Sequence, residues 1–329
     1  MKPIFPGRPF SPSMLRVVLL LMGVFWAAAG CAADSAADLV PAPYRLPAAV
    51  GEIASPSLVE ASGMAASRRR PGCFWMINDG GNDPVIYAVG PAGEDLGAVP
   101  LAGATNYDWE DIASFQRNGR PYLLIADTGD NRAIRKTAVL YLVREPEIPG
   151  RPGISKHKAT PVQSIRFRFP DGAMDCEALA VDPEGKIALM LTKRTRPPEL
   201  YSLDLAQTEG VATARRRMAV TTIPAPSQAE LMADPIYGRF RSQPTALDIS
   251  SDGSRAAVLT YGRAYLFERV PGETWEKVFA RKPKVLPPFS LRQAEALCFG
   301  IDGRSVFIST EKRPAPLLRL DAMDDMRPW

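Results

Sequence analysis

Short runs of apolar residues, separated by glycine, proline, asparagine and aspartate, recur along the chain from about residue 50 to its end. No long segment of this region has the spacing of apolar side chains that an amphipathic helix needs. Short apolar runs bounded by turn-forming residues are typical of β-strands. The pattern therefore predicts an all-β fold.

The apolar runs form a repeat. Five segments share a hydroxyl or acidic residue, then a small or acidic residue, then Leu, Ile or Met, and they begin at Ser62, Glu110, Glu177, Thr245 and Glu295. A second apolar run follows each, and a polar residue lies at or just past its end, at Asp79, Asp127, Lys193, Tyr261 and Glu311. In the five repeats, this polar residue follows the first residue of the repeat by 17, 17, 16, 16 and 16 positions. This constancy indicates one β-hairpin in each repeat.

A third apolar run follows in each repeat. It carries a tyrosine in the first four repeats and a leucine in the fifth, at Tyr87, Tyr141, Tyr201, Tyr265 and Leu318. The repeats begin 48, 67, 68 and 50 residues apart, which is about the length of a four-stranded propeller blade with its loops. The fifth repeat reaches the C-terminus after three strands, and the segment 48–53 can supply the fourth. We therefore predict a five-bladed β-propeller over residues 50–329, or six blades if the segment 211–237 contains a degenerate one.

The N-terminus is typical of a targeting segment. Lys2, Arg8 and Arg16 precede an apolar run over residues 17–29, which is too short to span a bilayer and suits a signal peptide. The ending Ala-Ala-Gly-Cys31 resembles the lipobox of bacterial lipoproteins. This resemblance implies a lipoprotein signal peptide over residues 1–30, a lipidated Cys31, and a flexible tether over residues 31–49.

The lipobox also implies a location and a partner. The protein is expected in the bacterial cell envelope, held to the membrane by its lipid. Because Ala32 rather than aspartate follows the cysteine, we expect the outer membrane, facing the periplasm.

Charge and residue counts exclude several classes of function. The formal net charge is +4, and removal of the three basic residues of segment 1–30 lowers it to +1, so nothing indicates nucleic-acid binding. The single histidine, His157, excludes metal sites built on several histidines and disfavours a Ser-His-Asp triad. Three cysteines remain after Cys31. Each lies in or beside an apolar run, which favours buried free thiols, with one disulfide as the alternative.

The first strand of a propeller blade lines the central channel, so the first residues of the five repeats should form a ring around the axis. Its members are Ser62, Glu110, Glu177, Thr245 and Glu295. Three converging carboxylates repel one another unless they are protonated or bind a cation. Oxygen ligands of this kind suit Ca²⁺ before Mg²⁺. The ring therefore predicts an axial calcium site, with a polar channel that holds ordered water as the alternative.

Two resemblances follow from these residues. The order Ser-Glu-Glu-Thr-Glu, one per blade, resembles the calcium-activated nucleotidases (apyrases), whose five-bladed propellers hold Ca²⁺ with a Ser-Glu-Glu-Ser-Glu ring. A set of uncharacterised bacterial secreted or lipoprotein β-propellers is resembled by three strings, Asp108-Trp109-Glu110-Asp111-Ile112-Ala113, Asp127-Thr128-Gly129-Asp130-Asn131-Arg132 and Asp175-Cys176-Glu177-Ala178-Leu179. The first resemblance implies Ca²⁺-dependent hydrolysis of phosphoanhydrides or phosphoesters.

The loops after the second strands should open beside the channel mouth. Those of the first two repeats are acidic and contain Asp79, Asp127 and Asp130, whereas the next begins Lys193-Arg194. Carboxylates facing cations suit an anionic substrate such as a phosphate. In this interpretation Lys193, Arg194 and Arg263 bind the anion, and Asp79 or Asp127 orients the attacking water.

Three functions remain open at this point. The first is a lipid-anchored envelope hydrolase with an axial calcium ion and an anionic small-molecule ligand. The second is a non-catalytic propeller that binds a ligand or an envelope protein around a structural metal. The third is a lactonase or esterase-type propeller, whose usual Asn and His ligands the ring lacks.

Overall fold

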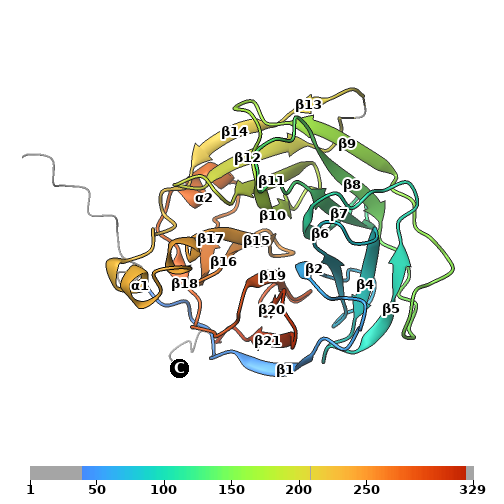
Figure 1. Ribbon diagram of the computed structural model, residues 1–329, viewed down its shortest axis with the longest axis horizontal. Helices are drawn as coiled ribbons and strands as arrows, with labels where there is room; N and C mark the ends of the chain where they lie inside the picture. The colour runs from blue at the N-terminus through green and yellow to red at the C-terminus, as the bar shows by residue number, and fades with distance from the viewer. Residues whose placement is uncertain (1–38, 208, 324–329) are drawn as a thin grey trace, which may run out of the picture. The chain divides into compact units, whose positions relative to one another are not determined.

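The computed structural model describes residues 39–207 and 209–323, and these form a β-propeller of five blades. In Figure 1 the chain colour runs once around the ring, and the innermost strand of each blade lies closest to the axis. The predicted all-β, five-bladed fold is confirmed. The predicted signal peptide and Cys31 lie outside the described residues.

Each blade is a mainly antiparallel sheet whose strands follow one another from the axis outward. Blade 1 contains β2 (Ala61–Ala66), β3 (Phe74–Asn78), β4 (Val85–Val89) and β5 (Asp95–Pro100). Blade 2 contains β6 (Trp109–Arg117), β7 (Arg120–Asp127), β8 (Ala138–Arg144) and β9 (Gln163–Arg168), with the short β13 (Ala212–Thr213) beside β9. Blade 3 contains β10 (Cys176–Val181), β11 (Ile187–Thr192), β12 (Glu199–Asp204) and β14 (Arg215–Ala219).

The remaining two blades complete the ring. Blade 4 contains β15 (Pro244–Ile249), β16 (Arg255–Thr260), β17 (Ala264–Glu268) and β18 (Lys284–Val285). Blade 5 contains β19 (Ala294–Phe299), β20 (Val306–Thr310), β21 (Pro316–Leu320) and β1 (Ala48–Glu52). The helical elements are short: α1 (Gln228–Ala233), the 3₁₀ turn η3 (Gly238–Phe240) and α2 (Trp275–Phe279). No helix among the described residues has the length and apolar character needed to cross a membrane.

The ring closes through the first strand of the chain. β1 pairs antiparallel with β21, with Ala48 opposite Arg319 and Glu52 opposite Pro316. The last blade is thus built from both ends of the described chain, as the sequence predicts. The alternative of six blades is excluded, because residues 211–237 supply only outer strands of blades 2 and 3 and the helix α1.

The hydrophobic core lies between the blades. The inner strands are buried along most of their length, and so their sequences contain continuous apolar runs. The recurrent tyrosines lie on the third strands. Tyr141 packs near Trp109 of its own blade, at a ring-centroid distance of 6.1 Å, within the hydrophobic cluster that blades 1 and 2 share. Cys73, Cys176 and Cys298 are buried free thiols, as expected.

The packed part of the chain begins earlier than residue 50. Ala42 and Tyr44 are buried, and Leu39 belongs to the hydrophobic cluster that blades 3 and 4 share. The amide of Ala42 donates to the carbonyl of Val285 at 2.7 Å. The segment 39–49, which the sequence assigns to the tether, therefore lies against the propeller because its apolar side chains fill gaps at the edges of blades 4 and 5.

Candidate functional site

A β-bulge at the start of every inner strand positions the predicted ring. In blade 2, Trp109 pairs with Asp127 and Asp111 pairs with Ala126, so Glu110 is an extra residue without a partner. The same irregularity falls on the corresponding residues of the other blades, Ser62, Glu177, Thr245 and Glu295. A bulge turns a side chain out of the regular alternation of a strand. The five residues share one local geometry because each is a bulged residue.

The two hydroxyl members of the ring join neighbouring blades. Ser62 Oγ donates to the backbone carbonyl of Trp109 at 3.0 Å, and Thr245 Oγ1 donates to that of Ala294 at 2.8 Å. Each hydroxyl thus bonds to the inner strand of the next blade. In this structure they connect blades, and the acidic chemistry belongs to the three glutamates.

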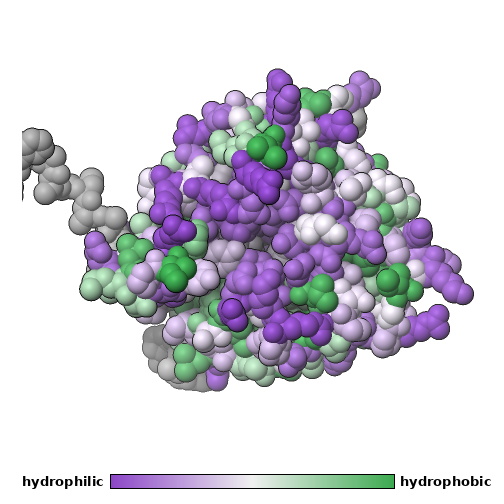
Figure 2. Space-filling model, viewed as in Figure 1, coloured by the Kyte–Doolittle hydropathy of each residue, from purple (hydrophilic) through white to green (hydrophobic). Residues whose placement is uncertain are grey.

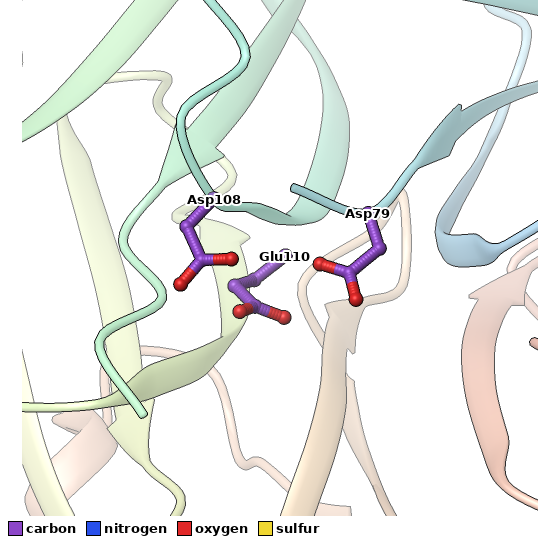
Figure 3. A group of neighbouring side chains, drawn as sticks. All are labelled: Asp79, Asp108 and Glu110. Atoms are coloured by element: carbon purple, nitrogen blue, oxygen red, sulfur yellow. The ribbon is translucent and has the colours of Figure 1, made fainter. Parts of the chain in front are cut away.

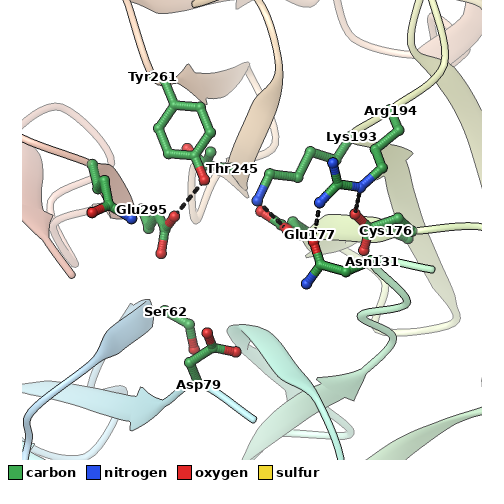
Figure 4. Close-up of polar contacts among 12 residues, drawn as sticks. Ser62, Asp79, Asn131, Cys176, Glu177, Lys193, Arg194, Thr245, Tyr261 and Glu295 are labelled. Atoms are coloured by element: carbon green, nitrogen blue, oxygen red, sulfur yellow. Dashed lines mark hydrogen bonds and ion pairs between the residues drawn. The ribbon is translucent and has the colours of Figure 1, made fainter. Parts of the chain in front are cut away.

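Two of the glutamates already have partners within the protein (Figure 4). Lys193 Nζ forms an ion pair with Glu177 and lies 5.1 Å from the centre of the Tyr261 ring. The Tyr261 hydroxyl donates to Glu295 at 2.6 Å. Burial alone would lower the pKa of Lys193, but the charge of Glu177 and further acidic neighbours outweighs burial and raises it. Lys193 is therefore a permanent cation near the axis.

Glu110 has a different environment. Its carboxylate converges with those of Asp79 and Asp108, with one oxygen of each lying within 4.8 Å of the others, as Figure 3 shows. Among the described residues, the side chains of Asp108 and Glu110 accept no hydrogen bond, and Asp79 accepts one from the Gly80 amide. Unpartnered carboxylates in a partly buried cluster have the chemistry of a cation site.

Two glycines make room for this cluster. A Cβ at Gly129 would lie 1.9 Å from Glu110 Oε1 and 2.5 Å from Asp108 Oδ2. A Cβ at Gly80 would lie 2.3 Å from Asp108 Oδ1. Only glycine leaves these oxygens in place, so the loops after β3 and β7 form a cradle around the three carboxylates. We call Asp79, Asp108 and Glu110 the acidic cluster.

The electrostatics of the acidic cluster favour neutralisation. Burial, with repulsion from Asp79, raises the pKa of Asp108 to about 6. Burial also raises the pKa of Glu110 well above its ordinary value, with repulsion from Glu177 as the next cause. Protonation or a bound divalent cation would each relieve this repulsion. The donor set, which consists of carboxylate oxygens alone, fits a hard cation such as Ca²⁺.

A second acidic group, Glu110, Asp175 and Glu177, overlaps the first. In this group Asp175 accepts the Asp130 amide at 2.8 Å and pairs with Arg194 Nε at 2.5 Å, and Glu177 pairs with Lys193. Cationic partners therefore already compensate two of its three carboxylates. The acidic cluster is the better candidate for a metal.

Sequence reasoning missed Asp108 and Asp175 as site residues. Each lies two residues before a ring glutamate, in the pattern Asp-x-Glu. The backbone shows that these are equivalent positions, because the carbonyl of Asp108 accepts the Thr128 amide and that of Asp175 accepts the Lys193 amide. The repeated Asp-x-Glu was the available signal.

The predicted catalytic residues separate into two groups. Asp79, Lys193 and Arg194 line a cavity of about 570 Å³ at the mouth of the channel. Asp127, Asp130 and Arg263 do not line it, and Arg263 pairs instead with Glu230. Asp127 is 2% exposed, accepts the amides of Tyr107 and Asp108, and pairs with Arg135 at 2.7 Å.

The strand register explains why Asp127 differs from Asp79. Asp127 pairs with Trp109 and so corresponds to Asn78, whereas Thr128 corresponds to Asp79. The carboxylate of Asp130 accepts the amides of Ile134 and Arg135 and stabilises its own loop. Both aspartates therefore shape the loop around the cavity without facing the cavity.

The lining of the cavity combines acidic, cationic and aromatic side chains. Besides the predicted residues, its lining includes Glu295 and Glu311, the guanidinium groups of Arg241 and Arg292, and the amides of Asn131, Gln243 and Gln293. Tyr237 and Phe240, from the segment that contains α1 and η3, complete the wall with Tyr261. Such a lining can bind an anion beside a metal.

Comparisons with known proteins identify no family for the chain. No protein-family model matches it, and no curated protein matches it. Among solved structures, a luciferin-regenerating enzyme is similar over 81% of this chain and 92% of its own, with a TM-score of 0.42 and 8% sequence identity. A likeness this remote carries no argument about function. The resemblance to calcium-activated nucleotidases stays a prediction.

Proposed function

We propose that the protein is a lipid-anchored propeller of the bacterial cell envelope that binds Ca²⁺ in its axial cavity and hydrolyses phosphoanhydrides or phosphoesters. One observation carries the proposal. Three carboxylates that have almost no partners converge in a glycine-lined cradle, at the edge of a cavity that also presents guanidinium groups. Asp79, Asp108 and Glu110 would hold the ion, which when bound would offset negative charge on the substrate phosphate.

The arginines of the cavity lining would bind and orient the substrate. Arg292 lines the cavity and forms no ion pair among the described residues, so its guanidinium is available to a phosphate. Arg194 also faces the cavity but is already paired with Asp175. Planar guanidinium groups bind phosphate oxygens through paired hydrogen bonds. This arrangement suits a substrate whose phosphate contacts both a guanidinium group and the bound ion.

Glu295 is the best-placed proton acceptor. Burial raises its pKa to about 7, the range in which a general base works best near neutral pH. In the proposed step a water oxygen bonds to phosphorus and its proton passes to Glu295. The bond from phosphorus to the leaving oxygen breaks, and the leaving group keeps the electron pair.

A thermal unfolding series tests the metal site. A ligand at about 100 times its dissociation constant stabilises a protein by about 2.7 kcal/mol. Wild type should therefore melt at a higher temperature in Ca²⁺ than in EDTA, and Glu110→Gln should lose this difference. The matched control is Glu184→Gln. It changes an exposed carboxylate in the turn between β10 and β11, away from the acidic cluster. If no ion raises the melting temperature of the wild type, the metal proposal is wrong.

An activity screen tests the chemistry separately. Pyrophosphate, nucleoside triphosphates and an aryl phosphate would be offered with Ca²⁺ and with EDTA. We expect Ca²⁺-dependent phosphate release that Arg292→Ala reduces and that Arg132→Ala, a change at an exposed loop arginine, does not.

The alternative is a non-catalytic scaffold that binds a ligand or an envelope protein. Lys193 favours it, because a built-in cation that pairs with Glu177 in blade 3 and lies over the Tyr261 ring of blade 4 can connect blades without chemistry. Stabilisation by Ca²⁺ without any turnover would support that alternative.

A further inference from the structure

The helix α1 differs from an ordinary surface helix in what it buries. A surface helix normally buries an apolar stripe against the core, but α1 fully buries none of its side chains. Ion pairs of Glu230 hold it to the propeller. Glu230 completes a capping box with Ser227 and pairs with Arg263 at 3.1 Å and with Arg241 at 3.4 Å.

The apolar side chains of this segment face outward instead. Met232 is 79% exposed, and Ile236 and Tyr237, in the turn between α1 and η3, are each 66% exposed. Figure 2 shows hydrophobic surface gathered over α1 and bordered by hydrophilic side chains. We call Met232, Ile236 and Tyr237 the apolar patch. Adjacent exposed apolar side chains held in place by ion pairs mark an interaction surface.

The position of the chain's first described residues indicates which partner the apolar patch contacts. Leu39 packs in the same hydrophobic cluster as Ile223, four residues before the cap of α1. The chain therefore enters the propeller on the side that carries the apolar patch. Eight residue steps separate Leu39 from Cys31, and they can span at most about 28 Å.

This span is short relative to the propeller. A folded domain of this size has a diameter of about 50 Å. A lipid on Cys31 would hold the blade 4 side against the bilayer, because the tether is too short for the opposite side to reach it. The effective concentration of lipid at the apolar patch would then be high.

The charge next to the patch fits an anionic bilayer. Arg196 and Arg239 are exposed, and Arg196 donates to the backbone carbonyl of Arg239. Neither guanidinium forms an ion pair among the described residues. Basic side chains beside apolar ones are the combination that binds anionic lipid surfaces.

We infer that the apolar patch and its two arginines dock onto an anionic phospholipid bilayer. The inference rests on the proposed lipid anchor. It has a consequence for the axial cavity, because Tyr237 belongs both to the patch and to the cavity wall. Docking would place the cavity mouth at the layer of lipid headgroups, so substrates would reach it from that layer.

The test uses the full acylated protein in vesicles of phosphatidylcholine with phosphatidylglycerol. An environment-sensitive fluorophore is attached to Met232→Cys or to Ile154→Cys, an exposed position beside β5 of blade 1. The native thiols that the structure describes are buried, so labelling selects the introduced cysteine. We expect brominated phospholipid to quench the probe at 232 strongly and the probe at 154 hardly at all.

Flotation tests the lipid anchor, and quenching tests the docking of the apolar patch separately. If the protein does not float with vesicles, the lipid anchor is wrong, and the docking inference falls with it. If it floats but the probe at 232 is no more quenched than the probe at 154, the anchor stands and docking is refuted. A blue-shifted probe at 232 that brominated lipid cannot quench would show that protein covers the patch, which also refutes docking. Quenching that weakens when phosphatidylglycerol is left out, or in the Arg196→Ala/Arg239→Ala variant, supports the role of the arginines.

Discussion

The glycine cradle gives the sharpest test of the acidic cluster. In Gly129→Ala the new methyl group would lie 1.9 Å from Glu110 Oε1 and 2.5 Å from the carboxyl carbon of Asp108. No heavy atoms pack this closely, so the two carboxylates must move. The contacts are the ends of side chains rather than backbone, and the propeller should still fold. The substitution therefore changes the site while leaving all three acidic residues in place.

The expected magnitude follows from binding linkage. If Ca²⁺ is present at about 100 times the wild-type dissociation constant, it adds about 2.7 kcal/mol to the free energy of unfolding. A 100-fold loss of affinity would reduce this increment to about 0.4 kcal/mol. Denaturant unfolding in Ca²⁺ and in EDTA measures the increment for each variant, so that any effect of the substitution on the metal-free protein cancels.

The control is Gly262→Ala, in the corresponding loop of blade 4. Its Cβ would meet Arg241 at 2.9 Å and not the acidic cluster. This variant should keep the wild-type increment even if it loses some stability in EDTA. A full Ca²⁺ increment in Gly129→Ala would refute the assignment of the metal to Asp79, Asp108 and Glu110.

Three further predictions concern the axial groups. Burial raises the pKa of Glu295 to about 7, above its value in the unfolded chain, so its contribution to stability is complete below about pH 4.5 and is lost as the pH rises through 7. This loss amounts to about 3 kcal/mol, and metal-free Glu295→Gln should lack it when unfolding is measured across this pH range. Lys193→Met leaves Glu177 buried without its cation, so the free energy of unfolding by urea should fall by about 3 to 5 kcal/mol. Lys193→Met/Glu177→Gln should recover part of this loss, and the ion-pair argument fails if it recovers none. Ser62→Ala removes the hydrogen bond to Trp109, which should cost about 1 kcal/mol without changing the Ca²⁺ increment. A lost increment would instead return Ser62 to the metal site.

The blades were predictable because propeller geometry repeats along the chain. Inner strands are buried on both faces, so each repeat shows a continuous apolar run, and the recurrent tyrosines mark the third strands. Closure by residues 48–52 followed from counting strands in the last repeat. The bulges were not predictable, because an extra residue in a strand leaves no mark in a pattern of apolar residues.

Asp127 shows where constant spacing misleads. Its offset of 17 from Glu110 equals that of Asp79 from Ser62, yet the two aspartates occupy different positions. Blade 2 has a longer first hairpin, with a tight turn at Asn118 and Gly119, which both have positive φ. The longer ladder moves the equivalent position to Thr128. Sequence spacing counts residues, whereas the site depends on the register.

The axial site is compensated in two different ways around its ring. On the side of blades 3 to 5, the protein supplies its own partners, since Lys193 pairs with Glu177 and Tyr261 donates to Glu295. On the side of blades 1 and 2, Asp79, Asp108 and Glu110 converge without a cation from the chain. Lys193 forms its ion pair with Glu177, and its charge lowers the pKa of Asp79 and Glu110 without outweighing their burial. We therefore expect the charge of the acidic cluster to be met from solution, either by protons, since the pKa values of Asp108 and Glu110 are raised, or by the metal ion that we propose.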